Sequence, residues 1–180
     1  MPARLIGFAR YKGAKSTAAC QCRVELVELF QLVWEIAEKV YDYPVYGIPC
    51  PGKDPNWGPW GYENRPIGGT QSASNHSRGR AMDINAPRNA QGATFTSDMP
   101  VALVRAIESL GFFWGGRYTG LVDAMHFEFI LRPDQVPAMV AKARAMLGSP
   151  QPPTGSRDSD DWFAAASVEE LWAGIIQAVA

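Results

Sequence analysis

The chain has 180 residues, 47% of them hydrophobic, and a formal net charge of −1 at pH 7. Its length and composition fit one globular domain with a short appendage. The balanced charge gives no electrostatic reason to expect binding to nucleic acid or to an anionic membrane. No apolar run in the sequence is long enough to span a bilayer. We therefore expect no nucleic-acid partner and no membrane insertion.

The first part of the chain divides at about residue 20. Residues 1–20 are basic, rich in small residues and without the continuous apolar segment of a signal peptide, so we expect an irregular arm and synthesis in a cytoplasm. From Cys22 to Tyr41 the apolar residues follow helical spacing, which predicts an amphipathic helix packed on a core. Cys20, Cys22 and Cys50 are too few for a disulfide framework. Buried or free thiols are favoured, with one disulfide through Cys50 as the alternative.

Residues 42–70 are rich in proline, glycine and aromatic residues, which excludes a regular helix. A long ordered loop in a compact domain is often functional. Trp57, Trp60 and Tyr62 are candidates to line a substrate groove, and covering the edge of the core is an equally good interpretation.

Downstream, regular patterns return. They predict, in order, a strand from Arg80 to Ala86, a helix from about Ser97 to Gly111, strands at 112–114 and 125–131, and a helix from about 133 to 147. Alternation in the first of these strands directs Asp83 toward a site, with Met82 and Ile84 toward the core. In the strand at 125–131 it places His126 and Glu128 on one side, so Glu128 is either a partner of the site or a solvent-facing residue.

The composition changes again near residue 149. Residues 149–161 are rich in proline and serine, as in a linker. Residues 162–180 contain a capping-box pattern followed by an apolar face, which predicts an amphipathic helix. We therefore expect one domain at 1–148, a linker at 149–161 and a C-terminal helix at 162–180.

Both histidines of the chain, His76 and His126, lie near carboxylates in the sequence. Two imidazoles with the carboxylate of Asp83 form a ligand set suited to Zn²⁺, and three protein ligands leave the open position of a catalytic site. Asp123, three residues before the second histidine, is placed to take a proton from water on such a metal. From spacing alone, a metal site and ordinary surface or capping residues are about equally favoured.

The residues around both histidines form an ordered set, Ser74-x-His76-x-x-Gly79-x-Ala81-x-Asp83 followed by Asp123-x-x-His126. This set resembles the signature of the zinc D-alanyl-D-alanine carboxypeptidase and L-alanyl-D-glutamate endopeptidase family, over about residues 62–130. The resemblance implies an α+β fold with a small central antiparallel sheet that carries the zinc site and is flanked by helices, as in the Hedgehog and DD-peptidase fold.

The resemblance also implies roles for individual residues. His76, Asp83 and His126 would hold Zn²⁺, and Asp123 would be the general base. Arg65 would bind a substrate carboxylate or stabilise the oxyanion, roles that suit the guanidinium fork. A sixth residue, Ser74, would orient the substrate or the His76 loop, or serve simply as a turn cap.

The activity so implied is hydrolysis of the peptidoglycan stem peptide, at an L-Ala-D-Glu or a D-Ala-D-Ala bond. The favoured setting is a phage endolysin, made in the host cytoplasm and acting on the cell wall after release, as a monomer or as part of a longer lysin. One alternative is a zinc-bearing, non-catalytic binding module of the same fold. A nuclease, suggested by Asn75-His76 near Arg78 and Arg80, is disfavoured by the charge balance and the missing basic patch.

Overall fold

The structure is a computed structural model, and it describes residues 5–47, 60–64 and 74–148. The helices and strands, in chain order, are β1 (Ile6–Lys12), β2 (Thr17–Arg23), α1 (Val27–Tyr41), β3 (Ala81–Asp83), β4 (Gln91–Gly92), α2 (Val101–Glu108), β5 (Phe112–Trp114), β6 (Val122–Asp123), β7 (His126–Phe129) and α3 (Val136–Gly148). Short 3-10 turns are η2 (Val24–Leu26), η4 (Ala86–Arg88), η5 (Gly115–Arg117) and η6 (Pro133–Gln135). The predicted linker and C-terminal helix lie outside the described residues.

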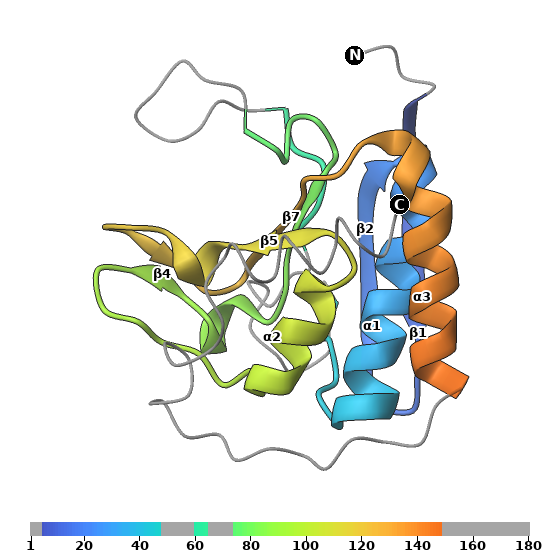
Figure 1. The fold of residues 1–180 in the computed structure, drawn as a ribbon. Coiled ribbons are helices and arrows are strands. Elements are labelled where there is room, and N and C mark those ends of the chain that lie inside the picture. The colour runs from blue at the N-terminus through green and yellow to red at the C-terminus, as the bar shows by residue number, and fades with distance from the viewer. Residues whose placement is uncertain (1–4, 48–59, 65–73, 149–180) are drawn as a thin grey trace.

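The architecture is α+β, as the sequence predicted, with small antiparallel sheets flanked by helices. The described strands form three sheets, of which the central one has the order β3-β7-β5 and the others are the pairs β1-β2 and β4-β6. In Figure 1, α1 packs against the β1–β2 hairpin and lies beside α3, and β4 lies at the opposite side of the molecule. The central sheet therefore lies between a helical layer and the β4–β6 pair.

The expectation of an irregular arm at residues 1–20 is wrong. This region supplies β1 and most of β2, which pair antiparallel from Ile6 opposite Arg23 to Lys12 opposite Thr17. The fully buried residues of this hairpin are all small, namely Ala9, Ala18 and Cys22. Small side chains let the helix approach closely, but they give only a weak apolar alternation, so the strand pattern is hard to detect in the sequence.

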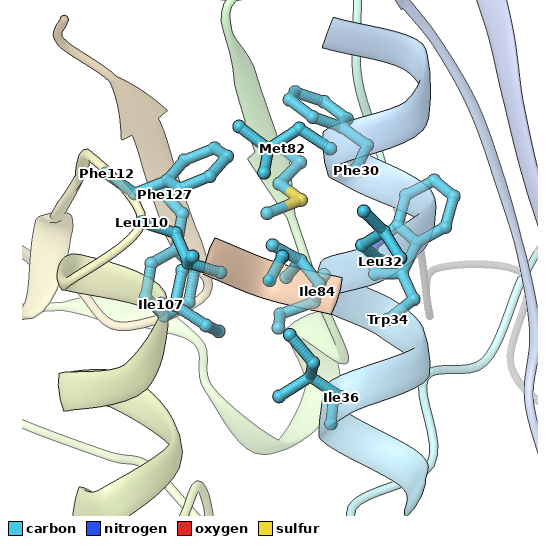
Figure 2. Packing of buried hydrophobic residues seen from close by; sticks show 14 of the residues in the cluster. Phe30, Leu32, Trp34, Ile36, Met82, Ile84, Ile107, Leu110, Phe112 and Phe127 are labelled. Carbon is cyan, nitrogen blue, oxygen red and sulfur yellow. The ribbon is translucent and has the colours of Figure 1, made fainter. Parts of the chain in front are cut away.

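The hydrophobic core lies between α1 and α2, with the end of β3 between them (Figure 2). The predicted apolar stripe of α1 is buried, including Phe30 and Ile36 at 0% exposure. Met82 and Ile84 point into the same core, as strand alternation predicted. Packing of these side chains fixes β3, so it also fixes the neighbouring Asp83 on the other side of the strand.

A short segment, residues 60–64, connects the hairpin to the central sheet. Trp60 forms a two-way backbone bridge with Asp83, with N···O distances of 3.1 and 2.9 Å. Tyr62 N donates to Gln21 O of β2 at 2.6 Å. The segment therefore lies between β2 and β3 and extends the hydrogen-bonded layer from the hairpin to the central sheet.

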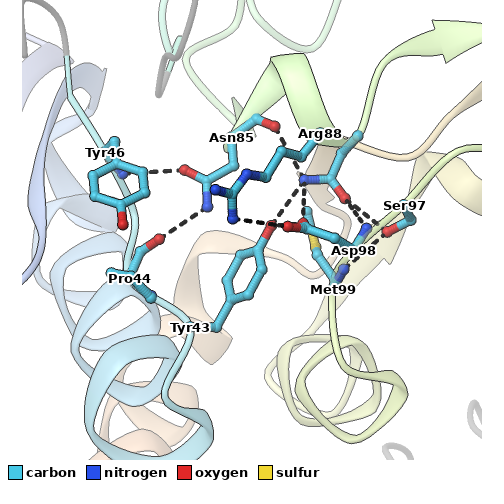
Figure 3. A network of polar contacts seen from close by, with 9 residues as sticks. Tyr43, Pro44, Tyr46, Asn85, Arg88, Ser97, Asp98 and Met99 are labelled. Atoms are coloured by element: carbon cyan, nitrogen blue, oxygen red, sulfur yellow. Dashed lines mark hydrogen bonds and ion pairs between the residues drawn. The ribbon is translucent and has the colours of Figure 1, made fainter. Parts of the chain in front are cut away.

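A polar network fixes the chain after β3 (Figure 3). Asn85 lies in the left-handed region, with φ 49°. Its side-chain amide donates to Pro44 O at 2.9 Å, and its side-chain oxygen accepts from Tyr46 N at 3.1 Å. Asn89, which is fully buried, donates to the hydroxyl oxygen of Tyr43 at 2.9 Å. These bonds tie the loop that leaves Asp83 to the end of α1.

Among the described helices, none combines the length and the apolar character needed to cross a bilayer.

Candidate metal centre

Two of the three expected metal ligands come from neighbouring strands of the central sheet. Asp83 on β3 lies directly opposite His126 on β7 in the antiparallel register. Directly opposed side chains have Cβ atoms about 4.5–5.5 Å apart, close enough for the imidazole and the carboxylate to meet. His126 Nδ1 is 2.9 Å from Asp83 Oδ1, so the strand pairing itself builds this contact.

The third residue, His76, lies on the turn that leads into β3. Gly79 closes this turn with φ +65°, a conformation that favours glycine, and its N–H donates to His76 O at 2.8 Å. The Ser74 hydroxyl accepts a hydrogen bond from His76 N at 3.1 Å. This bond fits both a role in orienting the His76 loop and a simple turn cap, so the roles given to Ser74 stay predictions.

The three side chains bring their ligand atoms together in a small triangle. His76 Nε2 is 3.1 Å from His126 Nδ1 and 3.2 Å from Asp83 Oδ1, and the third edge is the 2.9 Å already given. The residues are only 5%, 7% and 5% exposed, respectively. Ligand atoms about 2.0 Å from a tetrahedral zinc ion are about 3.3 Å apart, so the donor types and the spacing both fit such an ion. The cluster can therefore hold a metal ion.

Hydrogen bonds behind the imidazoles fix which nitrogen of each ring faces the triangle. His76 Nδ1 is 2.7 Å from the carbonyl oxygen of Gly61, so it must carry a proton, which leaves the lone pair of Nε2 for the triangle. His126 Nε2 is 3.4 Å from Glu128 Oε2, and Asn75 Nδ2 donates to the same oxygen. Glu128 is therefore a partner of the site rather than a solvent-facing strand residue.

The electrostatics of the cluster favour positive charge at its centre. Burial raises the pKa of Asp83, but hydrogen bonds from His126 and His76 outweigh it and bring the pKa down to about 2. Burial lowers the pKa of His126, but Asp83 and Glu128 outweigh it and raise the pKa to about 10. A cluster that favours positive charge in this way suits a metal cation, whose binding would displace a proton from the imidazole.

The expected general base, Asp123, lies on β6 near the cluster and is 8% exposed. Gln91 Nε2 donates to its Oδ2 at 2.9 Å, whereas its buried Oδ1 has no hydrogen-bond partner among the described residues. Burial and the charge of Asp83 raise the pKa of Asp123 to about 6, against the opposing effects of the two histidines and Gln91. A carboxyl with one oxygen fixed, the other unpaired and a pKa near neutrality is suited to accept a proton from water.

Tyr118 completes the described surroundings of the cluster. Its ring centroid is 6.1 Å from that of His126, and its hydroxyl donates to Glu128. Burial, with the charges of Glu128 and Asp123, raises the pKa of Tyr118 well above its ordinary value, so the phenol keeps its proton at neutral pH. The phenol therefore stays a hydrogen-bond donor beside the cluster.

An open cleft of about 520 Å³ borders the cluster. It is lined by Trp60, Gly61, Tyr62, Glu63 and Asp83. Trp60 and Tyr62 thus occupy the groove position that was one of two interpretations of this aromatic segment. Its volume lies in the range of ordinary ligand sites.

Two of the residues singled out in the sequence, Arg65 and Trp57, lie outside the described residues, as does Cys50. The roles given to Arg65 therefore stay predictions. Cys20 and Cys22 are buried and free, in agreement with the favoured interpretation.

Three residues of the site were not found from the sequence, namely Gly61, Gln91 and Tyr118. Gly61 acts through its backbone carbonyl, a group that every residue has, so the residue type does not reveal this role. Gln91 lies on a strand of two residues, too short to show any alternation. Tyr118 follows a 3-10 turn, and only the folded chain brings it to His126.

The fold and the cluster together define a class: a small α+β protein with a buried His-Asp-His set that can hold a metal ion. Residues 68–129 match the model of a family described as D-alanyl-D-alanine carboxypeptidase, which confirms the resemblance seen in the sequence. The matched segment is about a third of the chain and contains all three cluster residues and Asp123. No curated protein and no solved structure matches the chain significantly.

Proposed function

We propose that the protein is a zinc-dependent peptidase that hydrolyses peptide bonds in the stem peptide of bacterial peptidoglycan. The observation that carries the proposal is the triangle of His76, Asp83 and His126, whose three ligand atoms are 2.9–3.2 Å apart in a buried site that opens on a cleft. The matched peptidase family supports the reaction type, and its description supports a cell-wall peptide as substrate.

In this proposal the three cluster residues hold Zn²⁺. When bound, the metal supplies a Lewis acid that polarises the scissile carbonyl and makes an attacking water more acidic. Asp123 takes the proton of that water on its unpaired Oδ1 and then delivers it to the nitrogen of the leaving amine. Its raised pKa, about 6, lets the same carboxyl serve as base and then as acid near neutral pH.

The cleft supplies the binding surface for the peptide. Trp60 and Tyr62 present aromatic surface next to Asp83, so the scissile bond can lie beside the cluster while the rest of the peptide packs on the rings. Arg65 and Ser74 complete the proposal as substrate-binding residues, Arg65 through a substrate carboxylate or the developing oxyanion.

The test combines metal analysis with digestion of purified peptidoglycan. The wild-type protein should contain about one zinc ion per chain and release defined muropeptides, identified by mass spectrometry. Asp123→Asn should keep the zinc and lower turnover by roughly 10²–10⁴-fold. His76→Ala should lose both zinc and activity. A protein that binds zinc but releases no peptide at all would instead support the non-catalytic binding module.

The same digestion identifies the bond that is cleaved. New N-terminal D-Glu indicates an L-Ala-D-Glu endopeptidase, and released D-alanine indicates a D-Ala-D-Ala carboxypeptidase. We further propose that the setting is a phage endolysin that works as a monomer or within a longer lysin. Rapid lysis of bacteria whose membranes have been permeabilised would support that setting, and intact walls after such treatment would contradict it.

A further inference from the structure

The carboxyl proposed as general base has one direct side-chain partner among the described residues. Gln91 on β4 lies opposite Asp123 on β6 in the antiparallel pair, so both side chains project from the same face. Gln91 Nε2 donates to Asp123 Oδ2 at 2.9 Å. The rest of the glutamine side chain is exposed, at the edge of the site.

We propose that Gln91 is a positioning residue that holds the Asp123 carboxylate in its working orientation, an inference that rests on the proposed function. A general base must present one oxygen within about 2.6–3.2 Å of the proton that it takes. The hydrogen bond from the Gln91 side-chain amide fixes Oδ2 and thereby the rotation of the carboxylate. Oδ1 is then the oxygen that is left unpaired and buried.

The surroundings of Asp123 explain why an anchor is needed. The charge of Asp83 repels the carboxylate, and His126 and His76 attract it. In this proposal the hydrogen bond from Gln91 keeps the side chain from turning toward the imidazoles. There it would compete with Asp83 for the metal-binding nitrogens instead of facing water. The amide of Gln91 is a neutral donor, so it holds the carboxylate without neutralising its charge.

The hydrogen bond between Gln91 and Asp123 can be removed without unfolding the protein, for two reasons. β4 and β6 are two residues each and pair through their backbones, a contact that does not depend on the glutamine side chain. The side chain of Gln91 is exposed and contributes nothing to the buried core. Removing the amide should therefore leave fold and metal site intact and affect only Asp123.

The experiment compares Gln91→Met, which keeps the length of the side chain and removes the donor, with wild type and a matched control. The control is Gln31→Met, which removes another glutamine bond to an exposed acceptor, from Nε2 to Arg10 O at 2.8 Å, far from the cluster. With zinc-loaded protein and a stem-peptide substrate, Gln91→Met should lower kcat by roughly 10–100-fold with KM little changed. Gln31→Met should behave as wild type.

A second readout does not depend on turnover. The ¹³C signal of the Asp123 carboxyl, followed by NMR, should titrate at higher pH in Gln91→Met, because the donor that favours the ionised carboxylate is gone. Gln91→Glu, which replaces the donor with a like charge, should move the titration further in the same direction and lower kcat at least as much. A residue with a merely structural role would move neither measurement.

The outcomes separate this inference from the proposed function. Wild-type protein that binds zinc but hydrolyses no peptide would overturn the proposed function and this inference with it. Active wild-type protein with an unchanged kcat and an unchanged Asp123 titration in Gln91→Met would overturn this inference alone. Equal losses in Gln91→Met and Gln31→Met would also overturn it, because the effect would then be a general loss of surface hydrogen bonding.

Discussion

Gly61 lies where the hairpin, the cleft and the metal cluster meet. Its carbonyl oxygen accepts a hydrogen bond from His76 Nδ1 at 2.7 Å, which fixes the tautomer of that imidazole. A Cβ atom at this position would lie 2.0 Å from Gln21 O and 2.6 Å from Cys20 Sγ. Both of these atoms belong to β2, so the packing against the hairpin and the orientation of His76 depend on one residue without a side chain.

We predict that Gly61→Ala lowers the free energy of unfolding by about 1–3 kcal/mol, because the added methyl group cannot fit against β2 without moving the backbone. The displaced carbonyl should also weaken zinc binding by roughly 10–100-fold. Urea unfolding and competition with a zinc chelator measure the two effects. Gly148→Ala is the matched control, since a Cβ there meets nothing within 4 Å, and it should change neither quantity for the worse. Normal zinc affinity in Gly61→Ala would show that zinc binding does not depend on the hydrogen bond from His76 to this carbonyl.

At the scale of elements, the turn between β1 and β2 is held to α1 by Glu38. The carboxylate accepts hydrogen bonds from Lys15 N at 2.9 Å and from Ser16 N at 3.0 Å. Burial raises the pKa of Glu38, but the Ser16 side chain and the backbone N–H groups outweigh it, so the net pKa is lowered. The ionised carboxylate is thus the form that fastens the hairpin to the helix.

Glu38→Gln should therefore destabilise the protein by about 1 kcal/mol at pH 7. A lowered folded-state pKa means that this stabilisation is present above the unfolded pKa of 4.5 and is lost as pH falls through the folded value. The gap between wild type and Glu38→Gln, measured by urea unfolding, should shrink from pH 7 to pH 3. Glu35→Gln, which breaks only the surface pair with Lys39, should cost at most about 0.5 kcal/mol. A gap that widens in acid would contradict this account of Glu38.

Elements with large apolar side chains were predictable, and those with small ones were not. The stripe of α1 and the alternation around Phe127 place bulky residues at a clear period, and both predictions are confirmed. The β1–β2 hairpin buries alanine and cysteine, small residues whose weak hydrophobicity hides the period of two. In the site, the sequence identified the side chains that carry chemistry, but not Gln91, which reaches Asp123 only through strand pairing.

At the scale of the whole molecule, the segment that matches the peptidase family does not contain all that its site needs. Residues 68–129 include the cluster, but α1 supplies Phe30 and Ile36 to the core around β3, and Gly61 supplies the acceptor for His76. Through the bond from Tyr62 N to Gln21 O, the hairpin holds the segment that carries Gly61. The β1–β2 hairpin and α1 therefore support the elements that carry the His-Asp-His cluster.

Fragments of the chain test this dependence. Residues 1–148, the predicted domain, should unfold cooperatively and bind zinc as tightly as the full chain, since every described contact of the cluster lies within them. Residues 68–148 should show no cooperative transition, because β3 and α2 would lose the apolar surface of α1 that covers them. Thermal unfolding followed by circular dichroism, with and without zinc, distinguishes these cases. If residues 68–148 alone melt cooperatively and bind zinc like the full chain, the hairpin and α1 are an accessory to the site. If they do not, the cluster depends on residues 1–67 as well, because α1 and Gly61 support it from outside the matched segment.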